Sequence, residues 1–280
     1  MSSQGFPGPG DDLPEQAGRI VRDATDLEPR VAIVLGSGLG PALEGAIDET
    51  ASLGFVDLPG FPPPGVPGHA GRLVLGRLAG VPIAAWFGRI HFYEGHGMDV
   101  PALIPRVSRA LGATTLVLTA AVGGIDANLT AGTVVVLSDH VNLMGMTPLR
   151  GWRFSDGMPA FVGMQDVYDG RLASLALARA EALGVRAALG VYGAMSGPTY
   201  ETRAELQLLH AAGATVVGMS VVPEAVPAHA LAMRVLGLCS LTNAFGEHVT
   251  HAEVVRVSNE TAIAVGKLLV DLLPRMDEGA

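Results

Sequence analysis

VAIVLGSGLG, residues 31–40, joins a continuous apolar run to a glycine-rich segment. Its first half, Val31–Leu35, is apolar at every position and rich in β-branched residues, a pattern typical of a strand buried on both faces. Strands of this kind belong to parallel sheets that helices cover on both sides. The segment therefore predicts an α/β fold, in which the glycines form a connection at the carboxyl end of the strand.

The rest of the chain repeats the alternation of strands and helices. Further strands are expected at Arg72–Leu78, Val81–Phe87, Thr114–Thr119, Thr133–Ser138, Ala188–Ala194, Thr215–Gly218 and Val235–Thr242. Arg19–Leu27 is expected to be the end of a first helix, and further helices are expected at Val100–Leu111, Gly170–Leu183, Thr202–Ala212, Glu224–Arg234 and His251–Leu273. This order predicts a mainly parallel sheet flanked by helices.

Composition supports a single folded unit. The chain has 280 residues, of which 49% are hydrophobic and 16% charged, enough apolar material for a large core. Residues 1–12 are rich in glycine, proline and serine and are expected to form a flexible terminus. Because neither a repeat nor a linker divides the remainder, residues 13–280 are expected to form one domain.

The net charge and the hydropathy of the chain argue against two classes of partner, nucleic acids and membranes. The formal net charge of −9 argues against the binding of nucleic-acid polymers. Polar residues or proline interrupt every apolar stretch before it reaches the ~20 residues that a bilayer requires, so no membrane span is expected. The N-terminus lacks a signal-peptide pattern, and the single cysteine, Cys239, is expected to be a buried thiol. A cytoplasmic location is the consistent expectation.

Small or polar residues follow most of the expected strands. They are Gly36-Ser37, Gly88-Arg89, Ala120, Ser196-Gly197, Met219-Ser220 and Thr242-Asn243. In open α/β sheets, ligands bind at the carboxyl ends of the strands. We therefore expect a binding site where these residues meet.

The first of these strand ends, GSGLG, has the features of a phosphate-binding loop. Glycines let backbone N–H groups approach an anion, and Ser37 adds a hydroxyl donor. A dinucleotide-binding loop is an alternative, although its fingerprint G-x-G-x-x-G opens a helix and the third glycine comes one residue early here. A tight turn without a ligand is a second alternative.

GRIHFYEGH, residues 88–96, concentrates cations and an aromatic residue after an apolar strand. In an extended segment Arg89, His91 and Tyr93 project to one face, and arginine and histidine supply donors for phosphate oxygens. A solvated loop is the alternative. The sequence contains no compact set of Cys, His, Asp and Glu around the histidines that completes a tetrahedral site, so no metal is expected.

Two further segments suit a heterocyclic ligand. In GPTYE, the Glu201 carboxylate can accept from a ring N–H while Tyr200 flanks the ring, although capping of the first helical turn also explains a glutamate there. Asn243 offers both a donor and an acceptor for the edge of a base. An Asx turn or a helix cap explains Asn243 equally well.

Taken in order, GSGLG, VPGHAGRL, GRIHFYEG, GPTYETRAE, GMSVVPE, LTN and HAEV resemble the trimeric purine nucleoside phosphorylases. The resemblance runs from about Val31 to the C-terminal helix. It implies a mixed, distorted sheet in a homotrimer, and phosphate-dependent cleavage of the bond between purine and ribose, with phosphate as co-substrate and no metal or other cofactor.

The resemblance also implies a role for individual residues. The residues that it implies for phosphate binding are Ser37, His69, Arg89, His91, Ser220 and the backbone N–H of Ala121. Ribose contacts fall to Tyr93, Met219 and His251, and base contacts to Tyr200, Glu201 and Asn243. Asn243, Glu201 and His91 are the expected catalytic residues, because an enzyme accelerates this reaction by contacts that strengthen as charge develops on the base and the sugar.

Position 243 bears on the substrate. The related methylthioadenosine phosphorylases carry an acidic residue there, so an asparagine favours 6-oxopurine nucleosides such as inosine and guanosine. Phosphorolysis of 6-aminopurine thionucleosides remains an alternative, and so does a non-catalytic nucleoside-binding relative. The second alternative is based on a departure at the central strand. The family usually reads T-N-A-A-G-G there, and this chain has Ala120 in place of the asparagine and Val122 in place of the second alanine.

Overall fold

The computed structural model describes residues 6, 8–36, 38–66, 68–244 and 251–276. Its strands lie in one sheet of order β2-β3-β4-β1-β5-β8-β7-β6-β9. The strands are β1 (Val31–Leu35), β2 (Asp48–Gly54), β3 (Arg72–Leu78), β4 (Val81–Phe87), β5 (Thr115–Gly124), β6 (Val134–Asn142), β7 (Ala187–Ala194), β8 (Val216–Gly218) and β9 (Arg234–Asn243).

The sheet is mixed and partly closed on itself. β1 pairs in parallel with β4 and β5, while β2, β3 and β4 form an antiparallel edge. β5 also pairs with β9 in parallel and with β8 in antiparallel direction, so β5, β8, β7, β6 and β9 form a closed ring. The expected mixed, mainly parallel sheet flanked by helices is therefore confirmed, with a ring closure that an open sheet lacks.

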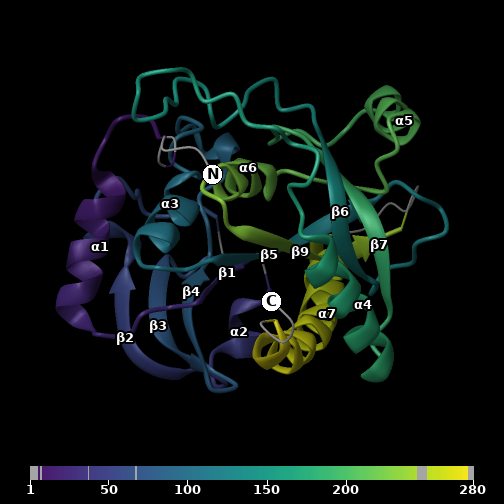
Figure 1. Ribbon diagram of the computed structural model, residues 1–280. Coiled ribbons are helices and arrows are strands. Elements are labelled where there is room, and N and C mark those ends of the chain that lie inside the picture. The colour runs from purple at the N-terminus through teal and green to yellow at the C-terminus, as the bar shows by residue number, and fades with distance from the viewer. Residues whose placement is uncertain (1–5, 7, 37, 67, 245–250, 277–280) are drawn as a thin grey trace.

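Helices cover both faces of the sheet (Figure 1). One face packs against α1 (Leu13–Ala24), α3 (Leu103–Ala110) and α6 (Val222–Ala230). The other packs against α2 (Gly40–Leu43), α4 (Gly170–Ala182) and α7 (His251–Leu272), whereas α5 (Arg203–Ala211) lies near β8. β1 is buried at every position between the two layers, as its composition predicts. No helix in the described part of the chain has both the length and the apolar character needed to cross a bilayer.

Several expected boundaries were wrong. The first helix ends at Ala24 instead of Leu27, because Thr25 is already extended with φ −163°. α6 begins and ends earlier than the expected Glu224–Arg234, because Arg234 opens β9. β5 and β6 run beyond their expected ends, since their extensions pair with β8 and β7.

The N-terminal segment also makes contacts with the body of the protein. Gly8 N–H donates to the Arg153 carbonyl oxygen (3.0 Å), and the Arg109 guanidinium lies 4.6 Å from the centre of the Phe6 ring. The flexibility of residues 1–12 stays a prediction.

Candidate active site

Arg89 follows β4 directly after Gly88 and is 2% exposed. Its Nε donates to Glu224 Oε1 (2.7 Å), and its Nη1 donates to the carbonyl oxygen of Thr119 (2.7 Å). Its Nη2 is buried and has no hydrogen-bond partner among the described residues. Because a buried N–H without an acceptor is costly, this nitrogen is placed to bind an anion that enters the site.

Gly36, at the end of β1, packs against the same guanidinium. Its N–H donates to Thr119 Oγ1 (2.9 Å), whose proton goes to the carbonyl oxygen of Val34 (2.8 Å). A Cβ at position 36 would lie 2.6 Å from the Thr119 carbonyl oxygen and 3.1 Å from Arg89 Nη1. Glycine is therefore required for the segment to approach the cation this closely.

The glycine-rich segment forms a turn beside Arg89. Leu39 N–H donates to the Gly36 carbonyl oxygen (3.1 Å), and Gly38 has φ +82°. The helix that follows, α2, has only 4 residues, which is too short for the helix that a dinucleotide fingerprint opens. Ser37, one of the expected phosphate ligands, lies outside the described residues.

Three rings stack next to Arg89. The centroids of His69 and His91 are 5.1 Å apart, and those of His91 and Tyr93 are 4.7 Å apart. His69 comes from the loop before β3 and its Nδ1 lies 3.0 Å from the Arg89 carbonyl oxygen. The structure thus brings His69 next to Arg89, His91 and Tyr93, and all four are residues expected to bind phosphate or ribose.

Both imidazoles are neutral at pH 7. Burial, and then the charge of Arg89, lower the pKa of His91 to about 2. Burial also lowers the pKa of His69. His91 Nδ1 lies 3.2 Å from Glu94 Oε1, and the tautomer of the neutral ring decides which of its two nitrogens donates.

Ser220 is held in place by a buried tyrosine and a strained turn. Its N–H donates to Tyr192 Oη (3.0 Å), and its Oγ lies 3.5 Å from the same oxygen. Val221 has φ +67° and ψ −61°, and Val222 N–H donates across it to the Ser220 carbonyl oxygen (2.7 Å). This γ-turn costs on the order of 1–3 kcal/mol at a β-branched residue, and strain of this kind is frequent at functional sites.

The expected ribose contacts meet at Gly197. A Cβ at that position would collide with Met219 Sδ and would lie 3.0 Å from the ring of Tyr93. Tyr93 is half-buried, and burial raises the pKa of its hydroxyl. The third expected ribose residue, His251, begins α7, and its side chain lies outside what the structure describes.

Glu201 lies just before α5 and is half-buried, so that burial raises the pKa of its carboxyl. The cap of α5 is Thr202, whose Oγ1 accepts from Glu205 N–H (3.2 Å) while Glu205 Oε2 accepts from Thr202 N–H (2.7 Å). The alternative that Glu201 caps the first turn is therefore wrong. Tyr200 is 87% exposed and does not pack against the core.

Asn243 ends β9, and its amide lies over β5. A Cβ on Gly123 would lie 3.6 Å from both Oδ1 and Nδ2 of Asn243. The Thr242 hydroxyl is 3.1 Å from Asn243 Oδ1 and 3.1 Å from the Val122 carbonyl oxygen, so these two acceptors share its proton. Because Oδ1 faces this hydroxyl, Nδ2 is the amide atom with donors for another partner.

One strand links the two ends of the candidate site. The carbonyl oxygen of Thr119 in β5 accepts from Arg89, and Gly123 of the same strand pairs with Asn243 of β9. These two positions are roughly 13 Å apart at about 3.3 Å per strand residue. Ala121, whose backbone N–H is the expected phosphate donor, lies between them in β5.

The departures from the family pattern lie on the buried side of β5. Ala120 and Val122 are each 2% exposed and pack into the hydrophobic core, whereas Ala121 and Gly123 are less buried. Alternate residues of a strand point to opposite faces. The change from the usual family pattern therefore alters core packing on the face opposite Ala121.

Sequence reasoning missed Glu224 and Tyr192, which hold Arg89 and Ser220. Glu224 had a signal, because an acid within the apolar stretch VPEAVPAHA must find a partner when it is buried. Tyr192 had none beyond its place in an expected strand.

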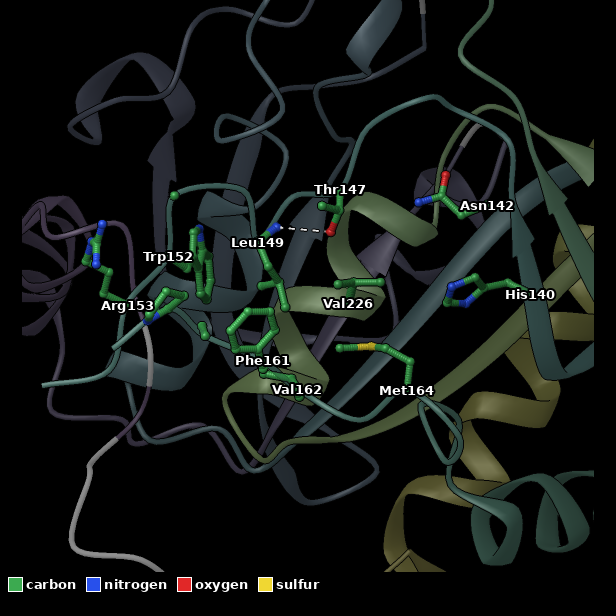
Figure 2. A pocket seen from close by; sticks show the side chains of 13 residues that line it. His140, Asn142, Thr147, Leu149, Trp152, Arg153, Phe161, Val162, Met164 and Val226 are labelled. Atoms are coloured by element: carbon green, nitrogen blue, oxygen red, sulfur yellow. Dashed lines mark hydrogen bonds between the residues drawn. The ribbon is translucent and has the colours of Figure 1, made fainter. Parts of the chain in front are cut away.

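A cavity of about 620 Å³ lies elsewhere, between the loop after β6 and α6 (Figure 2). His140, Trp152, Phe161 and Val226 are among its lining residues, and none of the expected site residues is. Within the described ranges, no group of three or more His, Cys, Asp or Glu side chains is placed to hold a metal ion.

Similarity to known proteins places the chain in a superfamily. The model of the phosphorylase superfamily matches residues 30–274, so the chain belongs to that superfamily. The chain is 39% identical over 259 residues to purine nucleoside phosphorylase 1 of Bacillus subtilis, covering 91% of this chain and 95% of that protein. It is 40% identical over 270 residues to the purine nucleoside phosphorylase of Mycobacterium tuberculosis, covering 95% and 97%.

A solved structure agrees with these relatives. Isoform 2 of purine nucleoside phosphorylase from Schistosoma mansoni, in complex with cytosine and ribose-1-phosphate, superimposes with a TM-score of 0.89 at 30% identity and covers 96% of this chain and 98% of that chain. Within the superfamily, the chain therefore belongs to the purine nucleoside phosphorylase family.

Proposed function

We propose that the protein is a pentosyltransferase of purine salvage that cleaves purine nucleosides with inorganic phosphate. A phosphate oxygen forms a bond to the anomeric carbon of the sugar as the bond from that carbon to the purine breaks. The products are the free base and ribose 1-phosphate, or its deoxy form. Phosphate is the co-substrate, and the reaction requires no metal or other cofactor.

The observation that carries this proposal is the arrangement along β5. Arg89, at the centre of the hydrogen-bond donors proposed to bind the anion, donates to the carbonyl oxygen of Thr119, and Asn243 pairs with Gly123 of the same strand. A sugar between these positions has an anion on one side and a base-reading amide on the other. In the proposed site Ser37, His69, Arg89, His91, Ser220 and Ala121 N–H bind phosphate, Tyr93, Met219 and His251 contact ribose, and Tyr200, Glu201 and Asn243 contact the base.

The chemistry follows from these contacts. The departing purine gains negative charge, and a donor at its N7 that strengthens in the transition state accelerates the reaction. Asn243 Nδ2 supplies that donor, and Glu201 accepts from a ring N–H. This pair favours 6-oxopurine nucleosides, inosine and guanosine, over 6-aminopurine nucleosides, because an unmatched polar partner discriminates strongly.

The test is the release of hypoxanthine from inosine with and without phosphate. Release that requires phosphate is the expected result, and Asn243→Ala should chiefly lower kcat. Asn128→Ala, in an exposed turn, is the control and should retain activity. Phosphate-independent release would indicate a hydrolase, faster cleavage of methylthioadenosine would indicate the sister activity, and binding without turnover would indicate a non-catalytic relative.

The proposed enzyme is a homotrimer. Exposed apolar side chains gather between β6 and α4, where Met146 is 37%, Met158 58% and Phe161 87% exposed. Exposed apolar side chains that form a patch mark contact sites between proteins, and these three come from one segment of the chain. Light scattering should give three times the mass of the chain, and Phe161→Glu should lower it, whereas a monomeric wild-type protein would contradict the proposal. A cytoplasmic location stays a prediction of the sequence.

A further inference from the structure

Glu224 is a buried carboxylate in a helix that otherwise packs mainly apolar residues. It is 1% exposed and lies in α6, whose other residues are mostly apolar and buried. Its Oε1 accepts from Arg89 Nε, whereas its Oε2 is buried without a partner in the described part of the chain. Burial raises the pKa of this carboxyl, and Arg89 opposes the shift. A buried ion pair is weak evidence for stability, so its presence needs another explanation.

The geometry of the guanidinium supplies that explanation. An arginine head group is planar, and its N–H donors form a rigid fork. Glu224 fixes Nε and the Thr119 carbonyl oxygen fixes Nη1, at 2.7 Å each. Two fixed points in a rigid plane determine where the third nitrogen points. That third nitrogen, Nη2, is the one without a partner among the described side chains and backbone atoms.

We propose that Glu224 is the positioning residue of the phosphate site, holding Arg89 so that Nη2 presents its N–H pair to a phosphate oxygen. This role rests on the proposed phosphorolysis. It is distinct from an electrostatic role, because the negative charge of Glu224 by itself offsets Arg89 and weakens the attraction for an anion. The reach of the Glu224 side chain and its charge therefore act in opposite directions on phosphate binding.

Two substitutions separate reach from charge. Glu224→Asp keeps the charge but withdraws the carboxylate, and it should raise the KM for phosphate about tenfold while changing kcat and the KM for inosine less than about threefold. Glu224→Gln keeps the reach, but its neutral amide oxygen accepts from Arg89 Nε more weakly than a carboxylate does. This weaker hold should outweigh the loss of the opposing charge and raise the phosphate KM, but only by about threefold. Asp271→Asn is the matched control, because it breaks a similar Arg179 Nε to carboxylate pair (2.6 Å) between α4 and α7.

The outcomes are separable from those of the proposed function. A phosphate KM in Glu224→Asp within about twofold of wild type, or one that changes in step with kcat and the inosine KM, overturns the positioning role. If Glu224→Asp does not fold by circular dichroism, a phosphate KM in Glu224→Gln below that of wild type overturns it. If no nucleoside is cleaved, the proposed function fails, and calorimetry with inorganic phosphate still compares wild type with Glu224→Asp. Equal affinities, or no binding by wild type, overturn the inference.

Discussion

Replacing Arg89 by lysine keeps the charge of the phosphate site and changes its geometry. The guanidinium engages Glu224 through Nε and the Thr119 carbonyl oxygen through Nη1, and it keeps Nη2 for a ligand. A lysine has one nitrogen on a flexible stem and no planar fork. That nitrogen can pair with Glu224, but it cannot also place an N–H donor where Nη2 lies.

The magnitude follows from the bonds that are lost. A hydrogen bond to a charged group contributes about 1.5–3 kcal/mol, which corresponds to a loss of roughly 10- to 150-fold in phosphate affinity for one such bond. Lysine is preferable to methionine here, because methionine would leave Glu224 buried without a partner at a cost of about 3–5 kcal/mol in stability.

The assay measures initial rates of hypoxanthine release from inosine over a range of phosphate concentrations. Arg89→Lys should raise the phosphate KM by roughly 10- to 150-fold. Arg77→Lys, at an exposed position of β3, is the control and should match wild type. If the phosphate KM of Arg89→Lys stays within about twofold of wild type, Nη2 does not bind phosphate and the reasoning fails.

Three further substitutions test other parts of the site. The folded protein keeps His91 neutral down to its pKa of about 2, whereas the unfolded imidazole takes up a proton near 6.5, so stability is lost as pH falls through this window. His91→Gln should make that loss shallower by up to about 1.4 kcal/mol per pH unit, and equal slopes in urea unfolding between about pH 5 and 6.5 would contradict it. Tyr192→Phe leaves Ser220 N–H without its acceptor and should cost about 1–3 kcal/mol in stability with a higher phosphate KM, so an unchanged Tm would argue against this role. Asn243→Asp should move the ratio of kcat/KM for inosine to that for adenosine toward adenosine by at least about tenfold, and a constant ratio would remove Asn243 from base selection.

The sequence predicts elements that bury a continuous apolar pattern and misses those stabilised by backbone pairing alone. β1 was predictable because every residue of VAIVL is buried. β2 was not, because its residues DETASLG are mostly exposed and the strand is held at the sheet edge by its antiparallel register with β3. The pairing of β5 with β8 joins Gly123 and Gly124 to Val217 and Val216, which are far away in the sequence, and no local pattern reports such a pairing.

The candidate site was predictable where chemistry is concentrated in one segment. Arg89, His91 and Tyr93 share a short stretch, and alternation along it placed them together. The face of β5 was not predictable from the same kind of reasoning. The departure at Ala120 was the basis of the non-catalytic alternative, yet Ala120 is 2% exposed and belongs to the core.

The electrostatics of the phosphate site explain why the two charge-conserving substitutions, Arg89→Lys and Glu224→Asp, should be harmful. Burial keeps His69 and His91 neutral, and the charge of Glu224 offsets that of Arg89. The described side chains around Arg89 therefore contribute little net positive charge, in a chain whose formal net charge is −9. An anion in such a place is recognised by N–H groups held in fixed directions, and not by an excess of cations. Affinity should then fall when direction is lost, even though every charge remains.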